Sequence, residues 1–130
     1  MSRVVEFPFP DNEELPRIPI ALSHAGASVS ANALLDSGST VNLLPYDLGE
    51  QLGLVWEKQT IRLPLAGNLA GVEARAAFVN VQVGDLEPVR LAFAWAQRSD
   101  LPLILGQTNF FRVFDVCFQR SRGVIEVVRR

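Results

Sequence analysis

The chain has 130 residues, of which 48% are hydrophobic and 20% are charged, and its formal net charge is -2 at pH 7. This composition predicts one globular domain with a packed core and excludes a chain that is disordered throughout. Because phosphate binding needs concentrated positive charge, the absence of a dense Lys/Arg cluster in the sequence argues against a nucleic-acid partner.

The N-terminal segment, residues 1–16, mixes acidic residues with prolines that prevent regular hydrogen bonding. We predict an extended arm or edge strand here, followed by a single domain over residues 17–130. Pro8 and Pro10 would break a signal helix, and the apolar runs elsewhere are far shorter than the roughly 20 residues that span a bilayer. We therefore expect a cytoplasmic protein with no membrane partner.

A β-hairpin is predicted next. Arg17–Ser23 and Ser28–Leu35 are apolar stretches, and the glycine-containing link His24–Ala27 between them suits a turn. Asp36 follows directly where the second strand ends. The hairpin therefore delivers an acidic side chain at the end of a hydrophobic strand.

Two short helices are predicted further along the chain. Leucines recur at every fourth position before Gly53, which indicates a helix over Pro45–Leu52 with a glycine stop. A second helix is expected over Thr108–Arg112. Because strands and helices do not alternate as they would in a parallel sheet, the helices are accessory elements.

Strand patterns dominate the second half of the chain. Apolar and polar residues alternate over Val79–Val83 and Val89–Trp95, with a Gly84-Asp85 turn between them. A further hairpin is predicted from Val113–Phe118 and Val124–Val128. With about seven strands in total, the predicted fold class is all-β.

The cysteine and histidine content limits other chemistries. Cys117 is the only cysteine and His24 the only histidine, so neither an intrachain disulfide nor a multi-histidine zinc site can form. We expect no cofactor and no metal. Cys117 lies in a strand pattern and is predicted to be a buried structural thiol. His24 lies in a hairpin link without a nucleophile elbow, which disfavours Ser-His-Asp catalysis.

The segment that carries chemistry is Ala33–Thr40, where Asp36 enters a turn rich in serine and glycine. The apolar residues before Asp36 would bury its carboxylate in part, and Gly38 permits a close approach that a side chain would forbid. Ser37 and Ser39 supply hydroxyls that can hydrogen-bond the turn or the acid. Asp-Ser-Gly alone is a weak signal, because the same residues are common in β-turns.

A second element makes the signal specific. Leu103–Gly106 begins 67 positions after Asp36 and is followed by Asn109-Phe110-Phe111. This order and spacing resemble the retroviral-type (retropepsin-like) aspartic peptidases, whose signature is an Asp-Thr/Ser-Gly turn after two hydrophobic residues, a flap hairpin, and a hydrophobic-hydrophobic-Gly segment before a short helix. The resemblance covers about Ile18–Val127. It implies a small, closed, barrel-like acid protease subunit with one or two short helices.

The resemblance implies a role for each matched residue. Asp36 would be the catalytic acid, and Ser37 would lock the two active-site loops of a dimer together. The active-site loop would be supported by Ser37, Gly38, Ser39, Ile104, Leu105 and Gly106. In the same family a flap hairpin covers bound peptide, and here it would be Ile61–Val79. The flap residues expected to bind substrate are Leu65, Gly67, Asn68, Leu69 and Gly71.

The chemistry of this family requires two carboxylates that share one proton. The ionised one activates a water molecule and the protonated one polarises the scissile carbonyl. Because the chain has one Asp-Ser-Gly motif, the second carboxylate should be Asp36 of a symmetry-related chain. We predict an aspartic endopeptidase that acts as a homodimer on peptide or protein substrates. The apolar residues Leu34, Leu65, Leu69 and Ile104 favour substrates with apolar residues beside the cut.

Two departures from the family pattern leave an alternative open. Retroviral subunits often carry an acid shortly after the catalytic turn and an arginine after the hydrophobic-hydrophobic-Gly segment, whereas this chain has Val41-Asn42 and Gln107. The charged contact that helps to hold those dimers is missing. The apolar segment Val124–Val128 could form an intersubunit sheet instead, or it could pair within the subunit. The alternative function is a catalytically inactive module of the same fold that binds peptide or dimerises.

Overall fold

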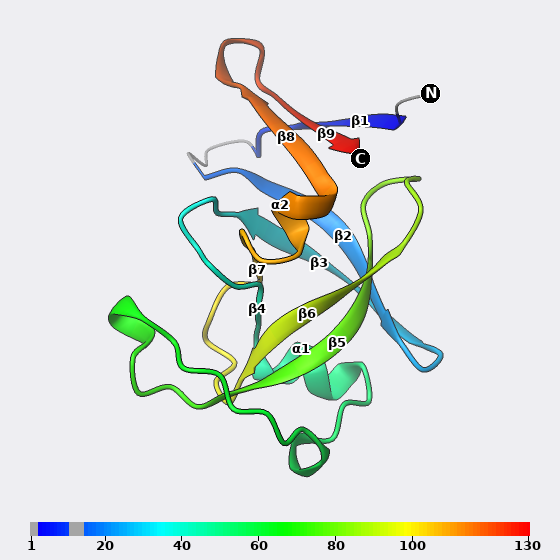
Figure 1. The fold of residues 1–130 in the computed structure, drawn as a ribbon. Helices are drawn as coiled ribbons and strands as arrows, with labels where there is room; N and C mark the ends of the chain where they lie inside the picture. The colour runs from blue at the N-terminus through cyan, green and yellow to red at the C-terminus, as the bar shows by residue number, and fades with distance from the viewer. Residues whose placement is uncertain (1–2, 11–14) are drawn as a thin grey trace.

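The structure, a computed structural model, describes residues 3–10 and 15–130. In this part of the chain a closed six-stranded barrel is joined to a three-stranded sheet, with two short α-helices and three single 3-10 turns (Figure 1). The predicted all-β class is confirmed. The expected N-terminal arm includes residues 1–2 and 11–14, which lie outside the described residues.

The barrel has the strand order β2-β3-β7-β4-β6-β5. β2 with β3, and β5 with β6, form antiparallel hairpins, whereas β3 with β7 and β4 with β6 are parallel pairs. The sequence does not predict the two-residue strands β4 and β7, since two residues show no periodicity. The strands are β2 (Arg17–His24), β3 (Ala27–Leu35), β4 (Leu43–Leu44), β5 (Ala74–Gln82), β6 (Val89–Ala96) and β7 (Ile104–Leu105).

The turn between β2 and β3 is tighter than predicted. The two strands pair along their full length to His24↔Ala27, which leaves only Ala25 and Gly26 in the turn. Both have positive φ angles, 47° at Ala25 and 88° at Gly26. Such a two-residue turn matches the right-handed twist of the strands, and β3 then runs to Asp36.

Helix α1 (Tyr46–Gln51) matches the predicted helix and is followed by Gly53 at a φ of 78°. It packs closely on β6, because a Cβ atom on Gly49 would lie 2.2 Å from the Trp95 Nε1 atom. Helix α2 (Phe110–Val113) begins two residues later than expected. The 3-10 turns are η1 (Trp56–Lys58), η2 (Gly67–Leu69) and η3 (Arg120–Arg122).

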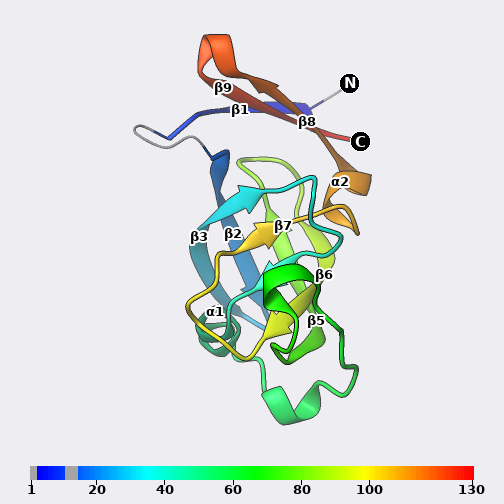
Figure 2. The same ribbon diagram turned by 90° about the vertical axis from the view of Figure 1, so that its left-hand side faces the viewer.

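The three-stranded sheet has the order β1-β9-β8 and lies at one end of the molecule, beyond α2 (Figure 2). Its strands are β1 (Arg3–Pro8), β8 (Phe114–Gln119) and β9 (Val124–Arg129). β9 is the central strand and pairs with both neighbours over its whole length. The segment Val124–Val128 therefore pairs within the subunit, and the strands left with an open edge are β1 and β8.

A continuous hydrophobic core joins the barrel to the inner face of this sheet. Trp95 and Phe93 fill the barrel, while Ile125 and Val127 reach the core from β9. Trp56 and Phe110 also lie in this core, as does Phe114 at the start of β8, whereas Phe111 is only partly buried. Burial of these side chains is the main force that holds the two β-structures together.

The prediction of a buried Cys117 is wrong, because the thiol is exposed. On β8, Phe114 and Val116 face the core, so the alternation of the strand turns Cys117 outward, opposite Glu126 of β9. The sequence pattern Val-Cys-Phe does not reveal which face is covered. The outer face of the sheet lacks a second layer within the described residues, and the thiol lies on that face.

Candidate active site

Asp36 is the first residue after β3 and is held by the neighbouring strand β7. The two strands pair in parallel at Leu35↔Leu105, and the Asp36 backbone N–H donates to the Leu105 carbonyl at 3.0 Å. The Ser39 N–H donates to the Asp36 carbonyl at 3.1 Å and closes a turn. The backbone at Asp36 is therefore fixed on both sides.

The Asp36 side chain is also oriented by its own turn. The Gly38 backbone N–H donates to Oδ1 of Asp36 at 2.9 Å. A Cβ atom at Gly38 would lie 3.2 Å from the same oxygen, so glycine lets the backbone come this close. The carboxylate is partly exposed, and Gly38 is its one hydrogen-bond donor among the residues that the structure describes. Oδ2 therefore keeps its hydrogen-bonding capacity for a substrate, a water molecule or a second subunit.

The residues that follow β7 form hydrogen bonds to the active-site turn. The Gln107 N–H donates to the Ser39 carbonyl at 2.8 Å, and the Thr108 N–H donates to the Thr40 carbonyl at 2.9 Å. The Gln107 side chain adds a third bond, from Nε2 to the Ser37 carbonyl at 2.8 Å. Gln107, which stands where the family often has arginine, thus binds the turn of its own chain.

A buried amide completes this support. Asn42 is only 1% exposed; its Oδ1 accepts from the Gly106 N–H at 2.8 Å, and its Nδ2 donates to the Ala92 carbonyl on β6 at 3.0 Å. The Ala92 N–H in turn donates to Oδ1 of Asn109 at 2.7 Å. Gly106 itself has no space for a side chain, since a Cβ atom would lie 2.4 Å from the Val41 carbonyl oxygen. Asn42 therefore connects the segment between the Asp36 turn and β4 to β6 and to the residue that follows β7.

A hollow of about 310 Å³ opens beside the turn. Its walls carry no charged side chain, and the active-site turn, β4, β7 and the loop before β5 all contribute to it. It is lined by Gly38, Ser39, Thr40, Val41, Leu43, Pro64, Leu65, Ala66, Gly67, Leu69 and Ile104. Such a surface suits an apolar side chain next to a backbone that can be hydrogen-bonded.

The far wall of this hollow is the loop of residues 61–73, which we call the covering loop. Its two ends are joined by the Arg62↔Arg75 bridge and by a bond from the Leu63 N–H to the Ala74 carbonyl at 2.9 Å. Gly67 and Gly71 have positive φ angles of 65° and 91°, which permit the sharp bends at its tip. The covering loop is a hairpin with few backbone bonds rather than two regular strands.

The structure brings most of the predicted site residues together. Gly38 and Ser39 from the turn and Ile104 from β7 line one hollow together with Leu65, Gly67 and Leu69 from the covering loop. Leu105 and Gly106 lie behind the turn as buried support, and Ser37 is exposed beside it. Leu34 is not among the lining residues. Asn68 and Gly71 line a separate polar hollow on the other side of the loop, together with Glu73 and Arg98.

Sequence reasoning missed Asn42 and Gln107 as supports of the site and treated them only as departures from the family. The available signal was the polar Asn42 between Val41 and the Leu43-Leu44 pair, a position where a polar side chain must be buried and therefore hydrogen-bonded. Within the described residues there is no cluster of three or more His, Cys, Asp or Glu side chains that could hold a metal ion. The same residues include no helix long and apolar enough to cross a membrane.

An Asp-Ser-Gly turn at the end of a barrel strand, bonded to a Leu-Gly segment and faced by the covering loop, is the arrangement expected of an aspartyl protease. Residues 20–108 match the family model for aspartyl proteases, and this range includes Asp36 and Gly106. The chain therefore belongs to the aspartyl protease family.

One solved structure supports the same fold. The crystal structure of a retropepsin-like aspartic protease from Rickettsia conorii aligns with a TM-score of 0.66 over 99% of this chain and 94% of that chain. The sequence identity is 16%, so the likeness concerns the fold. No curated protein sequence matches the chain.

Proposed function

We propose that this protein is an aspartic endopeptidase whose active site forms when Asp36 of two subunits meets across a homodimer. The observation that carries the proposal is the state of the Asp36 carboxylate, which is oriented by one hydrogen bond and remains partly exposed. One oxygen accepts the Gly38 N–H at 2.9 Å, the side chain is partly exposed, and the turn that carries it lines a hollow shaped for an apolar residue. A carboxylate that served only to close a β-turn would not need a cleft beside it.

In the proposed mechanism the two Asp36 carboxylates are chemically identical but have different roles. Carboxylates about 3 Å apart do not both ionise, as is known for aspartic proteases in general, so the pair holds one proton. The ionised Asp36 accepts a proton from water as the water attacks the scissile carbonyl. The protonated Asp36 donates to the carbonyl oxygen, and the leaving amine is protonated when the tetrahedral intermediate breaks down. Each subunit supplies one carboxylate and one covering loop.

The hollow supports a substrate preference within this function. Its walls are apolar apart from Ser39 and Thr40, so a side chain of leucine or phenylalanine type beside the cut is favoured over a charged one. The Ser39 and Thr40 carbonyls are already used by Gln107 and Thr108. Recognition of the substrate backbone is therefore assigned to the remaining groups of the turn and to the covering loop.

Hydrolysis of an unstructured polypeptide at mildly acidic pH tests this function. We expect cleavage that is blocked by a transition-state inhibitor of aspartic peptidases and that falls by a factor on the order of 10³ or more in Asp36→Asn, because the asparagine cannot ionise. Asp85→Asn, which changes an exposed acid in a turn far along the chain, is the matched control and should keep full activity.

Undiminished cleavage by Asp36→Asn would contradict the proposed function. If the wild-type protein instead binds the peptide saturably and releases it unchanged, the inactive binding module is the better description. Both outcomes can be separated by following the same fluorogenic peptide for binding and for turnover.

A further inference from the structure

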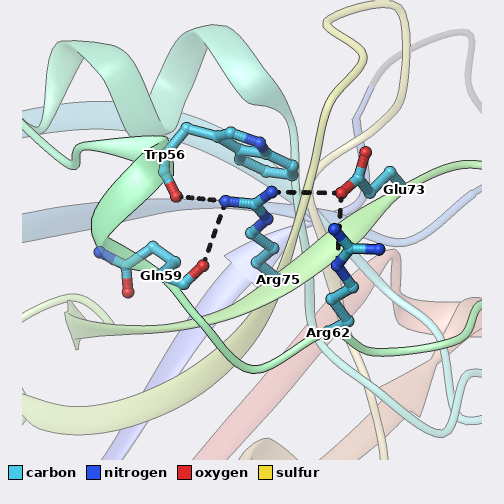
Figure 3. Close-up of polar contacts among 5 residues, drawn as sticks. All are labelled: Trp56, Gln59, Arg62, Glu73 and Arg75. Carbon is cyan, nitrogen blue, oxygen red and sulfur yellow. Dashed lines mark hydrogen bonds and ion pairs between the residues drawn. The ribbon is translucent and has the colours of Figure 1, made fainter.

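A second polar cluster lies at the base of the covering loop, apart from the Asp36 turn (Figure 3). Its centre is Arg75, the second residue of β5. One guanidinium nitrogen, Nη1, donates to the Trp56 carbonyl at 2.8 Å and to the Gln59 carbonyl at 3.3 Å. The other, Nη2, lies 3.3 Å from Oε1 of Glu73. Arg75 thus connects the η1 turn to the loop end that leads into its own strand.

The opposite end of the covering loop joins the same cluster. Arg62 Nε lies 3.8 Å from the Glu73 oxygen that also faces Arg75, and Figure 3 shows this carboxylate between the two arginines. The Arg62 side chain is 76% exposed and Glu73 is 40% exposed, whereas Arg75 is only 17% exposed. Because exposed ion pairs contribute little, the Arg75 contacts to backbone carbonyls are the strong part of the cluster.

The burial of Arg75 is compensated by an aromatic ring. Its guanidinium carbon lies 4.5 Å from the centroid of the Trp56 ring, which attracts a cation through its π face. The Nε atom of Arg75 is buried and makes no hydrogen bond among the described residues. A planar guanidinium over a ring, with two carbonyls and a carboxylate at its edge, is an arrangement that a lysine ammonium cannot reproduce.

Trp56, on which the Arg75 guanidinium lies, is packed within a cluster of aromatic rings. Trp56 packs edge-on against Trp95 at 5.2 Å and against Tyr46 at 5.8 Å between ring centroids. Trp95 is fully buried and stacks on Tyr46 at 5.4 Å. Arg75 therefore connects the base of a loop with few backbone bonds to the aromatic cluster of Tyr46, Trp56 and Trp95.

We propose that Arg75 is a positioning residue that holds the covering loop over the active-site hollow. This inference rests on the proposed peptidase function for its catalytic consequence, but the positioning itself is a property of the structure. We call the contacts of Arg75 with Trp56, Gln59 and Glu73 the clamp. When the clamp is intact, the covering loop meets the substrate in a preset orientation, and less conformational entropy is lost on binding. Without it, the loop pivots about the Arg62↔Arg75 bridge.

Hydrogen exchange of the protein tests the positioning directly. In Arg75→Gln we expect amide exchange in residues 63–72 to rise by about tenfold, because opening of the loop no longer breaks charge-assisted bonds. Exchange in β3 should stay at the wild-type rate. The matched control is Arg90→Gln, which removes a guanidinium 4.6 Å from the Phe78 ring, on β6 where it pairs with β5, and should leave exchange in residues 63–72 unchanged.

Steady-state kinetics with a peptide substrate tests the consequence. Arg75→Gln should raise KM by about fivefold to tenfold and change kcat by less than about twofold, since the Asp36 turn keeps all its bonds. Arg75→Lys should recover part of the loss, because an ammonium can satisfy one carbonyl and the Glu73 carboxylate but not the whole set.

The proposal is overturned if exchange in residues 63–72 is unchanged in Arg75→Gln, or if exchange rises equally in β3 and the other barrel strands. An equal loss in kcat with an unchanged KM would also overturn it. A wild-type protein that cleaves no peptide defeats the proposed function but not the clamp, because the exchange measurement decides that part without any substrate.

Discussion

At the scale of single residues, the site depends on side chains that bind backbone groups rather than one another. Asn42 bonds to Gly106 and Ala92, and Gln107 bonds to the Ser37 carbonyl. These bonds give partners to backbone N–H and C=O groups that would otherwise lack one near the turn. The Asp36 carboxylate is oriented because the backbone around it is hydrogen-bonded on several sides.

Replacing Asn42 tests how much the buried amide contributes. Asn42→Ala leaves the Gly106 N–H and the Ala92 carbonyl without partners, so the free energy of unfolding should fall by about 2–4 kcal/mol. Chemical denaturation measures this change. Asn80→Ala, at an exposed position of β5, is the control and should stay within about 0.5 kcal/mol of wild type. A loss of stability at Asn42 no larger than at Asn80 would contradict the assigned role.

The isosteric variant Asn42→Asp adds a pH dependence to the same test. A protonated carboxyl can donate to the Ala92 carbonyl as the amide does, whereas an ionised one cannot and places an unpaired charge in the core. The introduced group is therefore expected to favour its protonated form in the folded state. The stability lost relative to wild type should be larger at pH 7 than at pH 4.

At the scale of elements, the β2–β3 hairpin and the pairing of β3 with β7 place Asp36. The hairpin is closed by a strained turn, since Ala25 adopts a φ of 47° that residues with a Cβ atom rarely adopt. No atom lies within 4 Å of a Cβ built on the neighbouring Gly26, so a side chain at Gly26 would be opposed only by the backbone angle. The turn is stable only because the long strand pair determines its geometry.

Relief of this strain should stabilise the protein. Asn tolerates the left-handed region better than alanine, so Ala25→Asn should raise the free energy of unfolding by about 0.5–1 kcal/mol. The converse change, Gly26→Ala at a φ of 88°, should lower it by about 1–2 kcal/mol. Thermal unfolding of both variants provides the measurement. A decrease in stability for Ala25→Asn would show that the turn is not strained as described.

At the scale of the whole molecule, the barrel supports one carboxylate and the proposed enzyme needs two. The central position of β9 means that this strand is not available to a second subunit, so a partner that extends the sheet would add to β1 or β8. The Asp36 turn and the covering loop lie on the barrel, separate from that sheet (Figures 1 and 2). In the proposed dimer, a two-fold contact of the barrels would bring the two turns together.

Mixing subunits tests the proposed two-chain site. If wild type is incubated with an equal amount of Asp36→Asn until subunits exchange, only dimers with two carboxylates are active, and activity per wild-type chain should fall to about one half. Mixing with Asp85→Asn should leave activity per chain unchanged. If activity per wild-type chain is unchanged by added Asp36→Asn at every ratio, each chain acts by itself.

The sequence alone determined the class of the fold and the position of the acid. Strand alternation, turn residues and the Asp36-Ser37-Gly38 motif after a hydrophobic strand are local properties, and each is present within about ten neighbouring residues. The spacing to Leu103–Gly106 supplied the one long-range relation, because it matches a known pattern. The expected helix over Pro45–Leu52 and the β8–β9 hairpin were predictable for the same local reason.

The tertiary structure alone decided which polar groups support the site. Asn42 reaches residues 50 and 64 positions away, and Gln107 bonds to a carbonyl 70 positions away, so no local pattern encodes these bonds. It also decided that Cys117 faces outward and that Arg75 clamps the covering loop, since both depend on which face of a strand another element covers. The sequence gives the type and order of the side chains, but the hydrogen-bond partner of each side chain depends on which distant segments pack against it.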